Sequence, residues 1–130
     1  RDSAGRFRAV DPSNAQDVAT KTYVDLHNIE NIDYWSVTPA NDTITLRLYA
    51  QYAFDINNVT AITSSGTIDY TITIDDVNVL GLVSIGVSSV EATTTATSAL
   101  SVAAGATVKI VLASNSSGAD LALSMKITRT

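Results

Sequence analysis

The sequence predicts a mainly β protein, an antiparallel β sandwich or jelly roll, preceded by one short helix near the N-terminus. From Asp42 onward, apolar residues alternate with polar ones in one segment after another, as in half-buried strands. Clusters of Asn, Ser, Asp and Gly separate these segments at hairpin spacing. A capped, amphipathic stretch over residues 11–26 predicts the helix.

Composition excludes several classes of function. The chain has 130 residues, a formal net charge of −5 and no cysteine, which suits one domain with an appendage and leaves no thiol for a disulfide or a metal. The eight Lys and Arg residues are scattered, so we expect no nucleic-acid groove. No apolar run approaches the roughly 18 residues of a membrane span, so we expect no membrane insertion. Because the first residue is Arg, we expect a fragment of a longer protein.

The predicted helix has clear signals at its start. The stretch over residues 11–26 is DPSNAQDVATKTYVDL. Pro12 suits the first helical turn, where its missing N–H costs nothing. Ser13 and Gln16 have the spacing of a capping box. We expect the helix to end near Glu30 or Asn31.

Small and apolar residues on this helix recur at the 4, 3, 4, 3 spacing of a heptad seam. The seam consists of Ala15, Ala19, Thr22, Leu26 and Ile29. A helix this short is marginal in water, so another surface must pack on it. Two alternatives remain open, namely the β domain of its own chain or further copies of the helix. The expected organisation is an oligomerising segment over residues 1–32, a linker over 33–41 and a β-sandwich domain over 42–130.

Aromatic residues near the linker have two interpretations. Trp35, the only tryptophan, lies in the linker and is expected to wedge between helix and β domain. Tyr49 falls on the opposite strand face from Leu46 and Leu48, so we expect it to be exposed or at a subunit contact. An aromatic at such a position is core or interface, or it is a platform for a sugar ring.

The β domain is expected to contain seven or eight strands. The predicted strands cover residues 42–49, 52–56, 59–63, 68–74, 77–85, 87–97, 107–113 and 121–127. The strand over 77–85 is expected to be buried on both faces, or bent at Gly81. Turns are expected at residues 57–58, 64–66, 75–76 and 115–118, and a loop of small residues at 99–105.

Residues able to carry chemistry are few, and no catalytic site, metal site or cofactor is predicted. His27 is the only histidine and lies near the expected end of the helix, where a cation is favoured. Asp75 and Asp76 are followed by Val77, which leaves too few oxygen ligands for a calcium loop. The other carboxylates fall mostly in turns and strand ends, and no pair is marked out for hydrolysis.

Two segments resemble a known class of proteins. The stretch RFRAVDPSNAQDVATKTYVD resembles the recurring DP-x-x-AQDAATK-x-YVD segment of bacteriophage tail-fibre and related fibre proteins. The matching residues are Asp11-Pro12, Gln16-Asp17, Ala19-Thr20-Lys21 and Tyr23-Val24-Asp25. Val18 departs from the pattern, in which Ala is commoner. The C-terminal stretch LSVAAGATVKIVLASNSSGADLALSMKITRT is similar to the ends of such proteins.

The resemblance implies a homotrimer joined through the helix, with three β domains at the tip of a fibre. It implies an extracellular virion location after synthesis in the host cytoplasm, and non-catalytic attachment to a host cell-surface saccharide or protein. It also implies contacts to other fibre or baseplate proteins through an upstream part. The alternatives are a purely structural tip, a head-decoration fibre, or the non-catalytic end of a tailspike depolymerase.

Turn tips are the natural candidates for receptor contact, because loops on a rigid sheet carry most recognition. The candidate receptor-binding residues are Asn57, Asn58, Asp75, Asp76, Asn115 and Ser116. The turn at residues 64–66 is a further candidate.

Overall fold

The computed structural model describes residues 29–130, and this part of the chain is all β. The helix predicted over 11–26 lies outside the described residues, as do Ala15, Ala19, Thr22, Leu26 and His27. Ten strands follow in order: β1 (Ile29–Ser36), β2 (Asp42–Arg47), β3 (Phe54–Ile62), β4 (Ser65–Ile74), β5 (Val77–Asn78), β6 (Ile85–Val87), β7 (Ala92–Thr95), β8 (Ser101–Val102), β9 (Val108–Ala119) and β10 (Leu121–Arg129).

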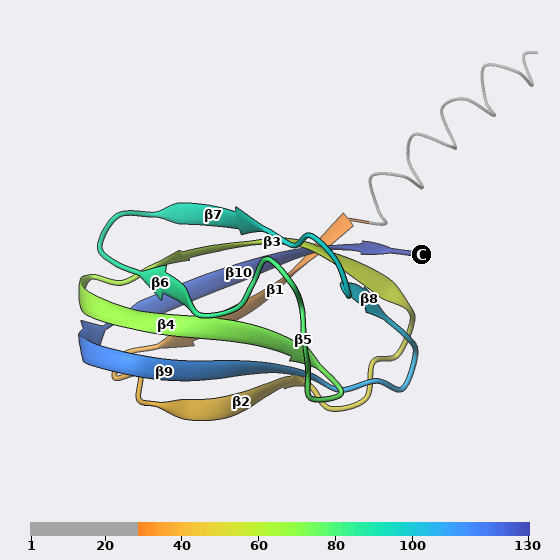
Figure 1. The fold of residues 1–130 in the computed structure, drawn as a ribbon, viewed down its shortest axis with the longest axis horizontal. Coiled ribbons are helices and arrows are strands. Elements are labelled where there is room, and N and C mark those ends of the chain that lie inside the picture. Colours follow the sequence, from red (N-terminus) through yellow and green to blue (C-terminus); the bar gives the residue numbers. More distant parts are fainter. Residues whose placement is uncertain (1–28) are drawn as a thin grey trace, which may run out of the picture.

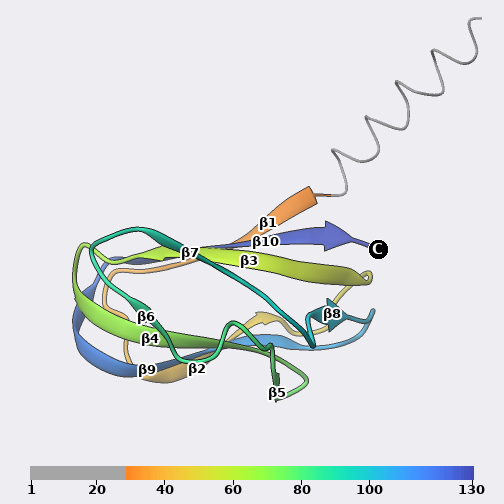
Figure 2. The same ribbon diagram turned by 45° about the horizontal axis from the view of Figure 1, so that its top comes forward.

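The strands form two five-stranded antiparallel sheets that face each other (Figures 1 and 2). The first has the order β1-β10-β3-β7, with β8 also paired to β3, and the second has the order β2-β9-β4-β5, with β6 also paired to β4. The chain alternates between the sheets from β1 to β4 and again from β9 to β10. This crossing pattern is that of a double-sheet jelly roll, which confirms the predicted β sandwich.

The core lies between the sheets, where the alternating residues of facing strands meet. On β4, Ile68 and Ile72 are completely buried, and on β10, Met125 is as well. The predicted alternation of 68–74 and 121–127 is therefore confirmed. Each such side chain contributes about 1.5–3 kcal/mol through burial, so the two sheets hold each other without help from a disulfide.

The structure differs from the sequence prediction at the entry to the domain. Residues 29–36 form β1, whereas the helix end and the start of the linker over 33–41 were expected there. β1 pairs with β10 from Ile29 opposite Thr128 to Ser36 opposite Leu121. Ile29, expected in the helix seam, is the first residue of this strand and is 44% exposed. The apolar residues of this segment, at 29, 32, 34 and 35, do not alternate strictly. The segment forms a strand because β10 offers a free edge of backbone hydrogen bonds.

A second difference concerns the expected turn at Asn57 and Asn58, which lie inside β3. Ile56 is opposite Ile127 and Asn58 is opposite Lys126, so Asn57 is the extra residue of a β-bulge. Its side-chain nitrogen donates a 2.6 Å hydrogen bond to Oγ1 of Thr128. Asn57 and Asn58, whose residue type is typical of turns, are therefore part of the continuous strand β3.

The expected turn over 115–118 is likewise part of a strand, because β9 continues to Ala119 and the chain reverses at Asp120. Ser114 and Ser117 have φ angles of 53° and 56°, which mark irregularities inside β9 rather than its end. The single strand predicted over 77–85 is wrong, because only its two ends belong to strands, in β5 and β6. The chain between them turns at Gly81, whose φ is 91°. The loop expected over 99–105 contains the short β8.

Candidate binding site

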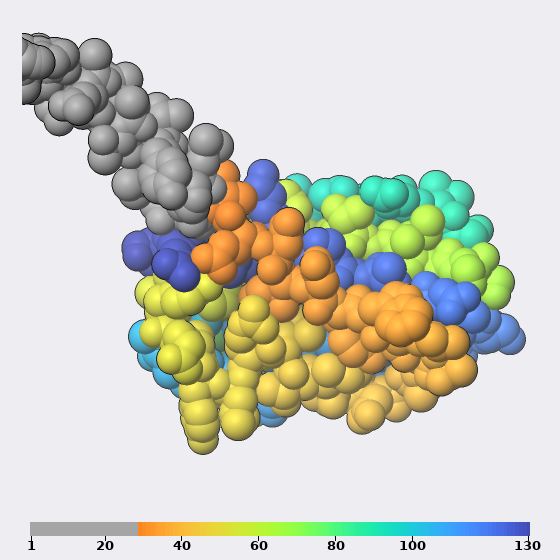
Figure 3. Space-filling model, turned by 180° about the vertical axis from the view of Figure 1, so that it is seen from behind, coloured from red at the N-terminus to blue at the C-terminus, as the bar shows by residue number. Residues whose placement is uncertain are grey.

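A hollow on the outer face of the first sheet is the main candidate site. Register places Trp35, Ala122 and Ile62 in one row across β1, β10 and β3. Because Ala122 is small and stands between two large side chains, the row leaves a hollow of about 250 Å³. Its lining residues are Asp33, Tyr34, Trp35, Thr60, Ala61, Ile62, Glu91, Ala122, Leu123 and Ser124. Figure 3 shows the molecule from behind, where β1 (orange) lies beside β10 (blue).

The position of this hollow follows from the strand register. The row lies next to the pair Ser36 and Leu121, at the end of β1 opposite Ile29. β1 begins at Ile29 and ends at Ser36, so the hollow lies toward the end of the sandwich away from Ile29.

Trp35 is the dominant side chain of the hollow. It is 63% exposed, so it is not part of the core that the structure describes. The helix against which it was expected to wedge lies outside the described residues. An exposed indole presents a flat apolar face with a polar N–H at its edge, which suits stacking on a sugar ring. Its exposure excludes the core interpretation and leaves the interface and platform interpretations.

Polar groups surround the indole. The neighbouring row places Asp33, Ser124 and Thr60 side by side on the same face. Thr60 shares a 2.7 Å hydrogen bond between hydroxyls with Thr93. Glu91 lines the hollow from the residue just before β7. Two carboxylates and no Lys or Arg are among the lining residues, which gives the hollow a negative potential.

The structure does not bring the six predicted receptor-contact residues together. Asn57 and Asn58 lie within β3, Asp75 and Asp76 form the β4–β5 turn, and Asn115 and Ser116 lie in β9. No single ligand of modest size reaches all three places. The hollow at Trp35 contains none of them.

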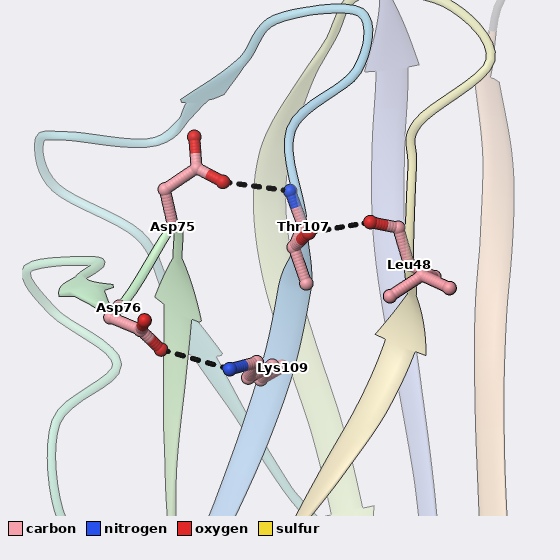
Figure 4. Close-up of polar contacts among 5 residues, drawn as sticks. All are labelled: Leu48, Asp75, Asp76, Thr107 and Lys109. Carbon is pink, nitrogen blue, oxygen red and sulfur yellow. Dashed lines mark hydrogen bonds and ion pairs between the residues drawn. The ribbon is translucent and has the colours of Figure 1, made fainter.

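The two aspartates at the β4–β5 turn hold the ends of strands (Figure 4). Oδ1 of Asp75 accepts a 2.9 Å hydrogen bond from the backbone N–H of Thr107. The hydroxyl of Thr107 in turn donates to the carbonyl oxygen of Leu48. Asp76 forms a 3.0 Å ion pair with Lys109. The geometry of this turn thus matches its hairpin interpretation.

Asn115 forms three hydrogen bonds, two of them to the loop between β1 and β2. Its Nδ2 donates to the carbonyl oxygen of Pro39 at 3.0 Å, and its Oδ1 accepts from the backbone N–H of Gly118 at 2.9 Å. Its own backbone N–H donates to Oδ1 of Asn41 at 2.9 Å. This residue therefore fastens the β1–β2 connection to β9.

Sequence reasoning missed Asp33, Ile62, Ala122 and Ser124 as partners of Trp35. Residues 29–36 lack the strict alternation that would predict a strand, and nothing local indicates that β10 and β3 lie beside them. Among residues 29–130, no group of three or more His, Cys, Asp or Glu side chains is arranged to hold a metal ion. The described part of the chain also contains no helix long and apolar enough to span a membrane.

Comparisons with known proteins identify the fold and no family. No family model and no curated protein sequence matches the chain. Among solved structures, the acid-stable capsid of Helicobacter pylori bacteriophage KHP30 is similar with a TM-score of 0.51 at 9% identity, covering 78% of this chain and 87% of that one. A subviral particle of infectious bursal disease virus (TM-score 0.40, 18% identity, 78% of this chain and 32% of that one) is a weaker match. Bacillus endospore appendages give a TM-score of 0.40 at 18% identity, over 78% of this chain and 86% of that one. At these identities the likeness extends to the β-sandwich fold alone, which this chain shares with a phage capsid component.

Proposed function

We propose that this chain is the distal attachment domain of a phage fibre, and that it binds a host cell-surface saccharide through the hollow at Trp35 without catalysis. The observation that carries the proposal is an indole 63% exposed on a rigid sheet, flanked by hydroxyl and carboxylate groups. The fibre-like segment over residues 6–25 and the fold shared with a phage capsid component support a virion location.

The proposal includes a homotrimer joined through the part of the seam over residues 15–26, because Ile29 belongs to β1. The β domain joins residues 1–28 at Ile29, at the end opposite the hollow. Parallel helices from three copies would therefore direct the three hollows away from the shaft. Leu26→Asp places a charge in the seam, and sedimentation of the full chain should then show a smaller particle than for the unaltered protein. An undiminished trimer would remove Leu26 from the interface.

Cell staining tests the attachment site. Fluorescently labelled protein is applied to candidate host cells, and Trp35→Ala is compared with Tyr49→Ala. Tyr49 is a matched control because it is 67% exposed and belongs to the β2–β3 loop rather than to the hollow. We expect Trp35→Ala to lose most of the staining and Tyr49→Ala to keep it. Equal staining by both variants would show that the protein does not attach to cells through the hollow.

Two other functions are distinguished by the same material. A structural tip or head-decoration fibre, whose partner is another virion protein, predicts that no host cell is stained by the unaltered chain. The depolymerase alternative requires the protein to act on host polysaccharide. Release of reducing ends from host polysaccharide by the purified chain would overturn a purely adhesive role.

A further inference from the structure

We infer that the hollow at Trp35 selects sugar rings that are uncharged or carry an amine, and discriminates against anionic rings such as uronic and sialic acids. This inference rests on the proposed function and names the ligand class of its site. It is carried by the shape of the hollow and by the charges of its lining.

The shape suits one ring. The volume of about 250 Å³ is below the roughly 300–1,000 Å³ of pockets that enclose a drug-sized ligand. Trp35 forms one wall, Ile62 the other, and Ala122 lies between them on the neighbouring strand. A pyranose ring stacked on the indole would therefore sit over β10, with the rest of a glycan outside.

The surface of the hollow is mainly apolar, and the polar groups that a hydroxylated ring uses stand at its edge. Asp33 and Ser124 are directly opposite each other on β1 and β10, one row from the indole. Within residues 29–130, neither side chain is engaged in a hydrogen bond, whereas Thr60 in the same row is bonded to Thr93. A carboxylate accepts two hydroxyl hydrogens at once, and a serine hydroxyl donates and accepts.

The charges decide the ligand class. Asp33 and Glu91 line the hollow, both are exposed, and no cation is among the lining residues. Lys126 belongs to the next row, opposite Asn31 and Asn58, so Asp33 stands between it and the indole. An anionic ring would approach two carboxylates to within about one Debye length, roughly 8 Å at physiological salt. A ring with an amine would meet the same two charges favourably.

A second copy of the chain is another conceivable occupant of this face. Stacking two such hollows together would bring the carboxylates of both copies into one interface, where like charges oppose each other. The only tryptophan of the chain lies in the hollow, so intrinsic fluorescence reports on either event. Self-association would shift the emission with protein concentration in the absence of sugar, and would remove the hollow as a free sugar site.

The experiment titrates the full chain with methyl glycosides of matched ring and different charge. The gluco, galacto and manno rings are each supplied as the neutral hexoside, the 2-amino-2-deoxy hexoside and the uronide, at low salt. We expect at least one neutral ring to change the Trp35 emission, its amino form to bind as tightly or tighter, and its uronide to bind about fivefold or more weakly. Added salt should narrow this difference.

Two variants and one control sharpen the result. Asp33→Asn combined with Glu91→Gln removes both charges and keeps an acceptor oxygen at each position. In this double variant we expect weaker binding of the neutral ring than in the unaltered chain, and binding of the uronide within about twofold of the neutral ring. Ala122→Leu should fill the hollow and abolish the response. Ala113→Leu is the control, because Ala113 is exposed on β9 in the other sheet and should leave binding intact.

The outcomes separate this inference from the function beneath it. Uronides that bind as well as neutral rings, or an unchanged ratio in the double variant, would overturn the ligand class. If none of the nine sugars changes the Trp35 emission while cell staining still depends on Trp35, the proposed ligand class is wrong. Attachment of the protein to cells through the hollow would remain supported. If Trp35→Ala stains cells as strongly as the unaltered protein does, the hollow is not the attachment site.

Discussion

Oε1 of Glu30 accepts a 2.6 Å hydrogen bond from the hydroxyl of Tyr52, which ties the start of β1 to the segment before β3. Oε2 of the same carboxylate pairs with Nε of Arg129 at 2.9 Å. The Arg129 guanidinium lies 3.8 Å from the centre of the Tyr52 ring. This cluster anchors the strand through which residues 1–28 connect to the domain.

The Tyr52–Glu30 bond should therefore contribute measurably to stability. Tyr52→Phe keeps the ring and removes the donor, and we expect the free energy of unfolding to fall by about 1 kcal/mol, because Glu30 is partly solvated. Chemical denaturation of Tyr52→Phe, Glu30→Ala and the double variant forms a double-mutant cycle, because each single variant removes one partner of the bond. A coupling energy of zero would show that the two groups do not interact in solution.

Asn115→Ala should destabilise the domain, although its sequence suggested a receptor contact. The substitution removes the bonds to Pro39 and Gly118, and we expect a loss of about 1–3 kcal/mol in thermal or chemical unfolding. Ser116→Ala is the neighbouring control, since Ser116 is exposed, and should remain within about 0.5 kcal/mol. If Asn115→Ala is as stable as the unaltered protein but no longer stains cells, Asn115 contacts the receptor as the sequence predicted.

Two glycines with positive φ should respond differently to alanine. Gly66 has φ +69° and a Cβ there would collide with the carbonyl oxygen of Ser117, whereas Gly105 has φ +89° and open space around the same position. Gly105→Ala should cost about 1–2 kcal/mol of backbone strain. Gly66→Ala should cost clearly more, because the β9 backbone must also move. Equal melting temperatures of the two variants would contradict the close approach of β4 and β9.

The two aspartates of the β4–β5 turn should also differ. Asp75→Ala removes the acceptor of the Thr107 N–H, and we expect a loss of about 1 kcal/mol. Asp76→Asn removes the charge from an ion pair in which Asp76 is 79% exposed and keeps a side chain that tolerates the φ of 65° at this position, so unfolding should change by only a few tenths of a kcal/mol. Denaturation in high salt should affect neither result strongly. A larger loss in the free energy of unfolding at Asp76 than at Asp75 would show that the ion pair, and not the hydrogen bond to Thr107, stabilises this turn.

Tyr70 makes the domain sensitive to alkali. Its ring is 1% exposed, and burial raises the pKa of its hydroxyl above 10.0, against a smaller opposing effect of a hydrogen bond to Thr94. The stability linked to this shift is complete below the unfolded pKa of about 10. It is lost as the pH rises from there through the raised folded pKa, because the unfolded chain releases the proton first.

Comparison of the unaltered protein with Tyr70→Phe isolates this effect. Above pH 10 the unaltered chain should lose stability relative to Tyr70→Phe by at most about 1.4 kcal/mol per pH unit. Tyr49→Phe, which changes an exposed ring, serves as the control. Parallel stability curves for all three proteins up to pH 11.5 would show that Tyr70 does not titrate in this way.

Local alternation was sufficient to predict much of the β domain. Ile68, Tyr70 and Ile72 on β4, and the apolar residues of β10, are buried as their spacing predicts, because a half-buried strand has a period of two. The errors lie where turn-forming residues occur inside strands. The sequence predicts turns at Asn57 and Ser117, whereas both are bulges in the structure, because pairing with β10 and β4 continues on both sides of them.

The sequence by itself determined the fold class, since alternating apolar residues can be buried only by stacking two sheets. It also provided the fibre-like segment on which the proposed virion role depends. The tertiary structure alone decided which side chains share the hollow with Trp35. Ala122 and Ile62 join it through the pairing of β1 with β10 and of β10 with β3, and such partners are distant in the sequence. Local propensity contains no information on that register, which is selected by the burial of both sheet faces together.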